Sequence, residues 1–139
     1  MTGVEVMVRG RSPLSDAQVA GLVHRVMRGE RRSGHISLTF VGRDTMRRMH
    51  REFKGVSRVT DVLAFTLAGP VGQVVGDVYV CPWVARREAR RRRLPVRQEL
   101  SRYIIHGLLH ILGHDHPEDG TRVQSPMWRR QERYLEGGR

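Results

Sequence analysis

The sequence predicts an α+β fold, a small mixed four-stranded sheet flanked by about five helices. Two observations lead to this prediction. Four short segments carry the alternating or continuous apolar pattern of strands, and about five longer segments repeat apolar residues at helical spacing. The two kinds of segment follow one another in mixed order, which is typical of a layered α+β architecture. A chain of 139 residues is long enough for one core, so we expect residues 1–139 to form a single domain.

The first elements are a strand, a helix and a strand. Val4 to Arg9 alternates apolar and other residues, as a strand with one buried face does. Ser15 and Gln18 have the spacing of a capping box, which predicts a helix to about Gly29. His35 to Val41 alternates again and predicts the second strand. The inward residues of the helix are expected to be Val19, Val23, Val26 and Met27.

The middle of the chain predicts a second helix and a pair of strands. Asp44 is expected to cap this helix, and Gly55 to stop it. Its apolar stripe is predicted to consist of Met46, Met49 and Phe53. Two further strands are expected at Asp61 to Leu67 and at Gly76 to Val80, joined by a Gly-Pro-Val-Gly turn.

Three helices are predicted in the last part of the chain. Pro82 can open the first, which runs to about Arg93. Pro95 can open the next, which runs to Leu112 and ends at Gly113. The last covers roughly residues 126 to 135. The arginine-rich run of residues 86–93 is interpreted as a solvated helix face, with a phosphate-binding stripe as the alternative.

The charge of the chain narrows the classes of partner. The formal net charge is +11, and Lys54 is the only lysine among the 25 basic residues. Such a balance favours polyanions, either nucleic acid or an acidic membrane surface. We find no apolar run long enough to span a bilayer and no signal-peptide core, so a cytoplasmic protein is expected. The lone cysteine, Cys81, is interpreted as a small buried hydrophobic residue.

A histidine cluster carries the chemistry. Four of the seven histidines lie between positions 106 and 116, in the pattern H-x3-H-x2-G-x2-H. His106 and His110 are one helical turn apart, so both imidazoles project from the same helix face. After the break at Gly113, His116 can return as a third ligand. Three histidines leave one coordination position for water, which is typical of a catalytic Zn²⁺ ion, so a single Zn²⁺ and a zinc-hydrolase-like fold are predicted.

The spacing matches the long zinc motif of the metzincin peptidases, but their glutamate is missing. Gly107 occupies that position, so a peptidase would lack its general base. His114 remains open as a replacement ligand, an outer residue or a catalytic group. Asp115 is interpreted either as a partner of a ligand imidazole or as a turn-forming residue. Three imidazoles would also accept nickel, copper or cobalt.

The run from His106 to His116 resembles the signature HGxLHLxGYDH of the YbeY-type endoribonucleases. It differs mainly by Ile111 in place of leucine and His114 in place of tyrosine. Thr60 to Phe65 is similar to the TDVLSF segment of that family, and Gly76 to Val80 to its GDI-type strand. The resemblance covers roughly residues 35 to 135.

This resemblance implies a YbeY-like metallohydrolase domain and a zinc-dependent endoribonuclease that cuts single-stranded RNA in the cytoplasm. It further implies ribosomal RNA and the small ribosomal subunit as partners, with roles in maturation of the small-subunit 3′ end and in ribosome quality control. No DNA and no membrane partner is expected. The family arginine six residues before the threonine is replaced here by Lys54, which keeps the charge but loses the bidentate fork. Arg51 or Arg58 can supply that geometry.

The expected catalytic residues are Lys54, Arg58, Asp61 and His114, and the general base is not identified among them. For Asp61, capping or bracing the strand that it begins is the favoured interpretation. Two other functions are compatible with the sequence. One is a non-catalytic, zinc-containing ribosome assembly factor, and the other is a metallopeptidase, which Gly107 and the net charge disfavour.

Overall fold

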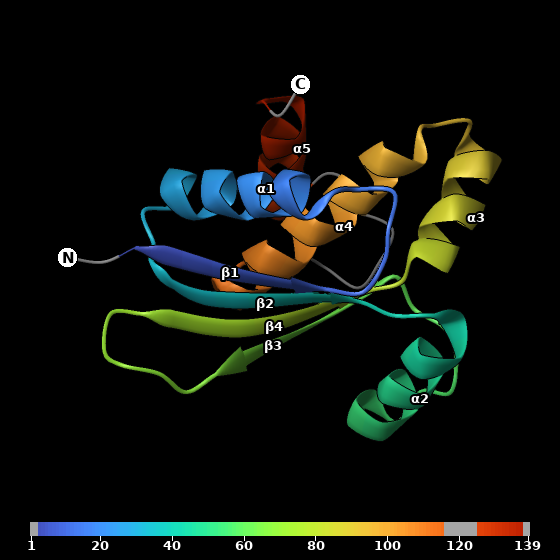
Figure 1. Cartoon of the computed structure of the whole chain (residues 1–139), viewed down its shortest axis with the longest axis horizontal. Helices are drawn as coiled ribbons and strands as arrows, with labels where there is room; N and C mark the ends of the chain where they lie inside the picture. The colour runs from blue at the N-terminus through green and yellow to red at the C-terminus, as the bar shows by residue number, and fades with distance from the viewer. Residues whose placement is uncertain (1–2, 116–124, 138–139) are drawn as a thin grey trace.

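The computed structural model describes residues 3–115 and 125–137. Within them, a four-stranded mixed sheet lies between helices (Figure 1). The strands are β1 (Val4–Arg9), β2 (Gly34–Phe40), β3 (Val62–Leu67) and β4 (Val74–Val80). The helices are α1 (Asp16–Gly29), α2 (Arg43–Lys54), α3 (Pro82–Arg92), α4 (Val96–Ile111) and α5 (Pro126–Gly137). The predicted α+β class is therefore confirmed.

The sheet has the strand order β1-β2-β4-β3. β1, β2 and β4 are parallel, and β3 pairs antiparallel with β4 at one edge. The connection from β1 to β2 contains α1, and the connection from β2 to β4 contains both α2 and β3. A parallel neighbour requires such a crossover, whereas β3 and β4 need only a short turn.

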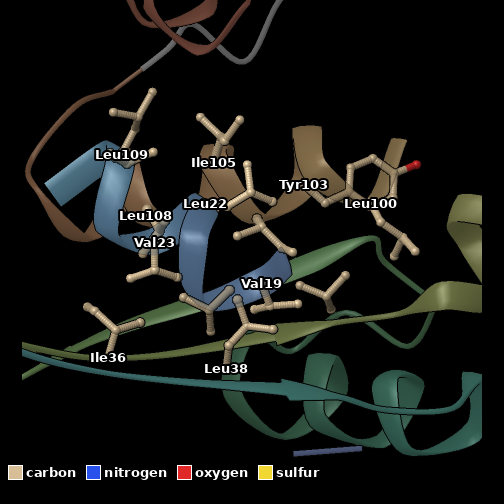
Figure 2. Close-up of a cluster of buried hydrophobic side chains, with 14 of the residues drawn as sticks. Val19, Leu22, Val23, Ile36, Leu38, Leu100, Tyr103, Ile105, Leu108 and Leu109 are labelled. Carbon is tan, nitrogen blue, oxygen red and sulfur yellow. The ribbon is translucent and has the colours of Figure 1, made fainter. Parts of the chain in front are cut away.

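The main core lies between the sheet and the pair of helices α1 and α4. Figure 2 shows this layer, in which Val19 and Val23 of α1 and Leu108 of α4 face Ile36 and Leu38 of β2. α4 also contacts α3, α5, β3 and β4, so it is packed on most of its circumference. α2 lies on the other side of the sheet (Figure 1). None of the described helices is both long and apolar enough to cross a bilayer.

Several local predictions are confirmed. The Ser15 side chain accepts the backbone N–H of Gln18 at 3.1 Å, and the Gln18 side chain accepts the N–H of Ser15 at 2.8 Å, so the capping box forms. Gly55 ends α2 with a left-handed φ of 73°. Cys81 is fully buried, and burial raises the pKa of its thiol.

The predicted details of α2 are partly wrong. The helix is capped by Gly42, so Asp44 lies inside the first turn, where it forms an ion pair with Arg43 at 3.6 Å (Nε to Oδ1). A carboxylate there still interacts favourably with the helix dipole. Phe53 is 56% exposed, although it makes an edge-on contact with Phe65. The buried polar position on this helix is His50, which the apolar pattern did not indicate.

Candidate metal centre and active site

α4 holds His106 and His110 side by side. Both side chains are half-buried on one face of the helix, with their ring centroids 4.7 Å apart and their planes at 78°. Most other positions from Glu99 onward are buried, so the backbone beneath the two rings is fixed by the core. Two imidazoles at this separation can present nitrogen donors to one ion.

The chain leaves α4 by a Schellman turn. Gly113 has a φ of 98°, its N–H donates to the His110 carbonyl at 3.0 Å, and the His114 N–H donates to the Leu109 carbonyl at 2.9 Å. This pairing satisfies the last carbonyls of the helix. The predicted stop at Gly113 is confirmed, and the chain reverses just after the histidine pair.

The third expected ligand, His116, lies outside the described residues, so its role stays a prediction. Within residues 3–115 and 125–137, no three histidine, cysteine or carboxylate side chains come together as a metal-ligand set. The two described histidines would supply two of the four ligands of a tetrahedral site. Imidazole nitrogen suits zinc, copper, nickel and iron better than it suits magnesium or calcium.

His114 is engaged by α1. Its Nε2 lies 2.7 Å from Glu30 Oε1 at the C-terminal end of that helix. From α5, Arg130 donates to Glu30 Oε2 at 3.0 Å, and the Tyr134 hydroxyl donates to the same oxygen at 2.5 Å. Burial opposes ionisation of Glu30, but the hydrogen bonds of Tyr134, His114 and Arg130 together lower the pKa of its carboxyl. His114 therefore connects the turn after α4 to α1, and its expected catalytic role stays a prediction.

Gln131 is a site residue that sequence reasoning missed. It is 1% exposed, and its Oε1 lies 2.7 Å from Nδ1 of His106. A signal was present, because Met127, Gln131 and Leu135 occupy the inward positions of α5 at helical spacing. A glutamine within an otherwise apolar stripe requires a polar partner.

Behind Gln131 lies a network of ion pairs whose centre, Glu99 and Arg102, is buried. Gln131 Nε2 donates to Glu132 Oε2 at 3.1 Å, and Glu132 is held by two parallel hydrogen bonds from Arg102, each of 2.9 Å. Arg102 also donates to Glu99, which a further arginine, Arg92, approaches at 3.3 Å. The network thus joins α3, α4 and α5 beneath one wall of the site.

One hollow, of about 470 Å³, opens beside the histidine pair. Its lining includes His50, Lys54 and Asp61 besides His106 and His110. The structure therefore places Lys54 and Asp61 in the same hollow as the two histidines.

Arg58 has a different position. It is exposed on the loop between α2 and β3. It is not among the described residues that line the hollow. Its backbone carbonyl accepts a hydrogen bond from Nδ1 of His50 at 3.0 Å. His50 thus fixes this loop from within. A catalytic role for Arg58 stays a prediction.

Asp61 braces the start of β3. Its Oδ1 accepts the backbone N–H of Val62 at 2.7 Å and lies 3.3 Å from the hydroxyl of Thr60, while its carbonyl accepts the N–H of Cys81 at 3.0 Å. β3 accordingly begins at Val62, one residue after the predicted start. These contacts support the bracing interpretation of Asp61 and leave a catalytic role as a prediction.

A second hollow, of about 390 Å³, adjoins the first and shares Thr60, Asp61 and His106 with it. Its outer wall includes Arg87 and Arg92 of α3. Two arginines of the arginine-rich run therefore line a hollow and do not lie only on a solvated helix face. Beside it, Trp83 is 37% exposed, with the guanidinium carbons of Arg87 and Arg43 at 4.8 and 5.2 Å from its ring centroid.

Position 107 has no room for a side chain. A Cβ there would lie 2.9 Å from Cγ1 of Val78 and 3.1 Å from Cγ2 of Val62. The glutamate of a metzincin peptidase could be placed here only if the sheet moved away from α4. The structure thus strengthens the argument against a peptidase.

Comparisons with known proteins identify the family of the chain. The family model described as Endoribonuclease YbeY matches residues 11–138. The chain is 40% identical over 119 residues to the Endoribonuclease YbeY of Anaeromyxobacter sp. (strain Fw109-5), covering 83% of this chain and 62% of that protein. For the Endoribonuclease YbeY of Thermotoga maritima the identity is 34% over 102 residues, covering 73% and 66%. The matched segment thus spans a little under two thirds of these two relatives.

A longer match and a solved structure extend this similarity. The chain is 31% identical over 126 residues to the Endoribonuclease YbeY of Halorhodospira halophila, covering 85% of this chain and 82% of that protein. The solution structure of TM1509 from Thermotoga maritima superposes with a TM-score of 0.67 at 28% identity, covering 96% of this chain and 88% of that one. The chain therefore belongs to the Endoribonuclease YbeY family.

Proposed function

We propose that this chain is a metal-dependent endoribonuclease that hydrolyses single-stranded RNA. The observation that carries the proposal is the position of the histidine pair. His106 lines both hollows and His110 lines the first, while Arg87 and Arg92 line the second. Family membership supports the activity. The net charge of +11 supports a polyanionic substrate.

His106 and His110, with His116 as the expected third ligand, would hold one Zn²⁺ ion. When bound, such an ion supplies Lewis-acid polarisation of a phosphoryl oxygen and activation of water near neutral pH. Lys54, which lines the same hollow, would contact a non-bridging phosphate oxygen as a point charge. Arg87 and Arg92 would bind the phosphates of neighbouring nucleotides from the second hollow.

A single-stranded substrate is compatible with these two hollows. They share Thr60, Asp61 and His106, so a strand that filled both would pass the ring of His106. A single strand has the backbone freedom to follow such a path. Trp83, which is 37% exposed and lies beside Arg87, would offer a stacking surface for a base if a guanidinium group moved off its ring.

In the cell, we infer a cytoplasmic protein that acts on ribosomal RNA and the small ribosomal subunit, in 3′-end maturation and ribosome quality control. Neither DNA nor membrane is proposed as a partner. These assignments rest on the family resemblance and on the charge. Depletion of the protein would be expected to leave an extended small-subunit RNA 3′ end, measured by ligation of an adapter to the RNA 3′ ends and sequencing.

The activity is tested with purified protein, an unstructured RNA and a matched duplex. Cleavage of the unstructured RNA is expected, with loss upon addition of chelator and recovery upon addition of zinc. His110→Ala should abolish cleavage. His35→Ala is the matched control and should retain cleavage, because His35 is an exposed histidine of β2 that pairs with Glu5 of β1 at 3.2 Å.

Three results would contradict the proposal. Cleavage that persists in chelator indicates a contaminating nuclease. Binding of RNA without cleavage by folded, zinc-loaded protein indicates the non-catalytic assembly factor. Hydrolysis of casein in place of RNA indicates a metallopeptidase.

A further inference from the structure

A directional hydrogen-bond chain reaches His106 from the protein interior. Gln131 lies between the His106 ring and the Glu132 carboxylate, with Oε1 at 2.7 Å from Nδ1 and Nε2 at 3.1 Å from Oε2. Gln131 is 1% exposed, so bulk water does not compete for either end of its amide. Each link therefore constrains the next one.

Glu132 determines which groups donate and which accept along this series of hydrogen bonds. Two parallel hydrogen bonds from Arg102 hold this carboxylate. Burial opposes its ionisation, but the hydrogen bonds of Arg102 and Gln131 outweigh burial and lower its pKa. An ionised carboxylate is only an acceptor. The part of the Gln131 amide that faces Glu132 must then be the NH₂ group, and the carbonyl must face His106.

A carbonyl oxygen can only accept, so Nδ1 of neutral His106 must carry the proton. In that tautomer the lone pair lies on Nε2. We propose that Gln131 and Glu132 are positioning residues, which together fix the tautomer and the ring orientation of His106 so that Nε2 is the metal-ligating nitrogen. This inference rests on the proposed role of His106 as a ligand. Partners that orient a ligand imidazole typically change metal affinity by about 10- to 100-fold.

The alternative is that Gln131 only packs α5 against α4. The two roles differ in what they predict for the ring nitrogens. An isolated neutral imidazole exists as two tautomers, and packing alone does not select the one with the proton on Nδ1. The tautomer in metal-free protein therefore separates a positioning role from a structural one.

The experiment uses the full chain, labelled with ¹⁵N and stripped of metal, at about pH 8.5, where an ordinary imidazole with a pKa of about 6.5 is neutral. Long-range ¹H–¹⁵N correlation spectra report which ring nitrogen carries the proton. Wild type is expected to show His106 with its proton on Nδ1. Gln131→Leu should lose this preference and bind zinc about 10- to 100-fold more weakly in competition with a chelator of known affinity.

Two further variants complete the test. Gln131→Glu keeps an acceptor facing Nδ1 and should preserve the tautomer. Leu135→Ala, a buried position on the same helix, loosens the packing of α5 and should preserve both the tautomer and the zinc affinity. The proposal is overturned if wild-type His106 carries its proton on Nε2. It is also overturned if Gln131→Leu changes zinc affinity no more than Leu135→Ala does.

If Gln131→Leu fails to fold, the wild-type spectrum and Gln131→Glu still decide the matter. No RNA is present in these measurements. A protein that shows the expected tautomer but cleaves no RNA would refute the proposed function and leave this inference standing. A protein that cleaves RNA but carries the His106 proton on Nε2 would refute this inference and leave the proposed function standing.

Discussion

Substitution of Gly107 by alanine gives a quantitative test of how tightly α4 is fitted to the sheet. The added Cβ would lie 2.9 Å from a Val78 methyl and 3.1 Å from a Val62 methyl, whereas ordinary contacts begin at about 3.4 Å. Val78 is fully buried in β4, which pairs with strands on both sides, so it cannot withdraw. Overpacking of this kind costs about 1–3 kcal/mol. Replacement of a helical glycine by alanine stabilises the helix by about 1 kcal/mol.

Gly21 provides the matched control, because it is an exposed glycine within α1 whose added Cβ meets no heavy atom within 4 Å. Gly21→Ala should therefore gain about 1 kcal/mol from helix propensity alone. The difference between the two variants isolates the steric cost and should be about 1–3 kcal/mol. Urea unfolding of metal-free protein, fitted with a common slope, measures this difference. If Gly107→Ala proves as stable as Gly21→Ala, the proposed fit of α4 against β3 and β4 is wrong.

Three other predictions concern acid stability, thiol reactivity and RNA binding. The lowered pKa of Glu30 means that its ionised form stabilises the fold above the ordinary value of 4.5, and that this stability is lost as pH falls through the lower folded value. Glu30→Gln should thus be less stable than wild type at neutral pH, but its free energy of unfolding should fall less on acidification. Urea unfolding at neutral and at acidic pH measures this, and equal falls in the two proteins would refute the prediction. Cys81, buried and with a raised thiol pKa, should not react with a thiol reagent until the protein unfolds in urea. RNA affinity should fall linearly with salt on logarithmic axes, and Arg87→Ala should reduce the slope by about 0.7, whereas Arg32→Ala, on the loop after α1, should not.

Local patterns in the sequence predicted most of the elements. These signals are local. The capping box at Ser15 joins two residues three positions apart, while the prolines at positions 82 and 95 and the glycines at 55 and 113 act through their own backbone angles. The one-turn spacing of His106 and His110 likewise needs only a helix to bring the rings together. The fold class could be predicted from the order of these elements. The order of the strands within the sheet could not, because that order depends on which strands pair across long loops.

What could not be predicted depends on contacts between distant segments. Gln131 meets His106 only because α5 packs on α4, and His114 meets Glu30 only because the turn after α4 returns to α1. The cap of α2 was misplaced for a different reason. Asp44 is a preferred capping residue, but the backbone is already helical at Arg43, so Gly42 takes the cap position. A preference of about 1 kcal/mol is easily overridden by such a constraint.

The enclosure of α4 has a consequence for when the site exists. A helix that contacts α1, α3, α5, β3 and β4 cannot fray by itself, so its innermost amides should exchange with solvent only when the whole molecule opens. His106 and His110 lie on this helix, so their rings come together only once α4 has packed against its neighbours. We therefore expect whatever chemistry they support to begin late in folding.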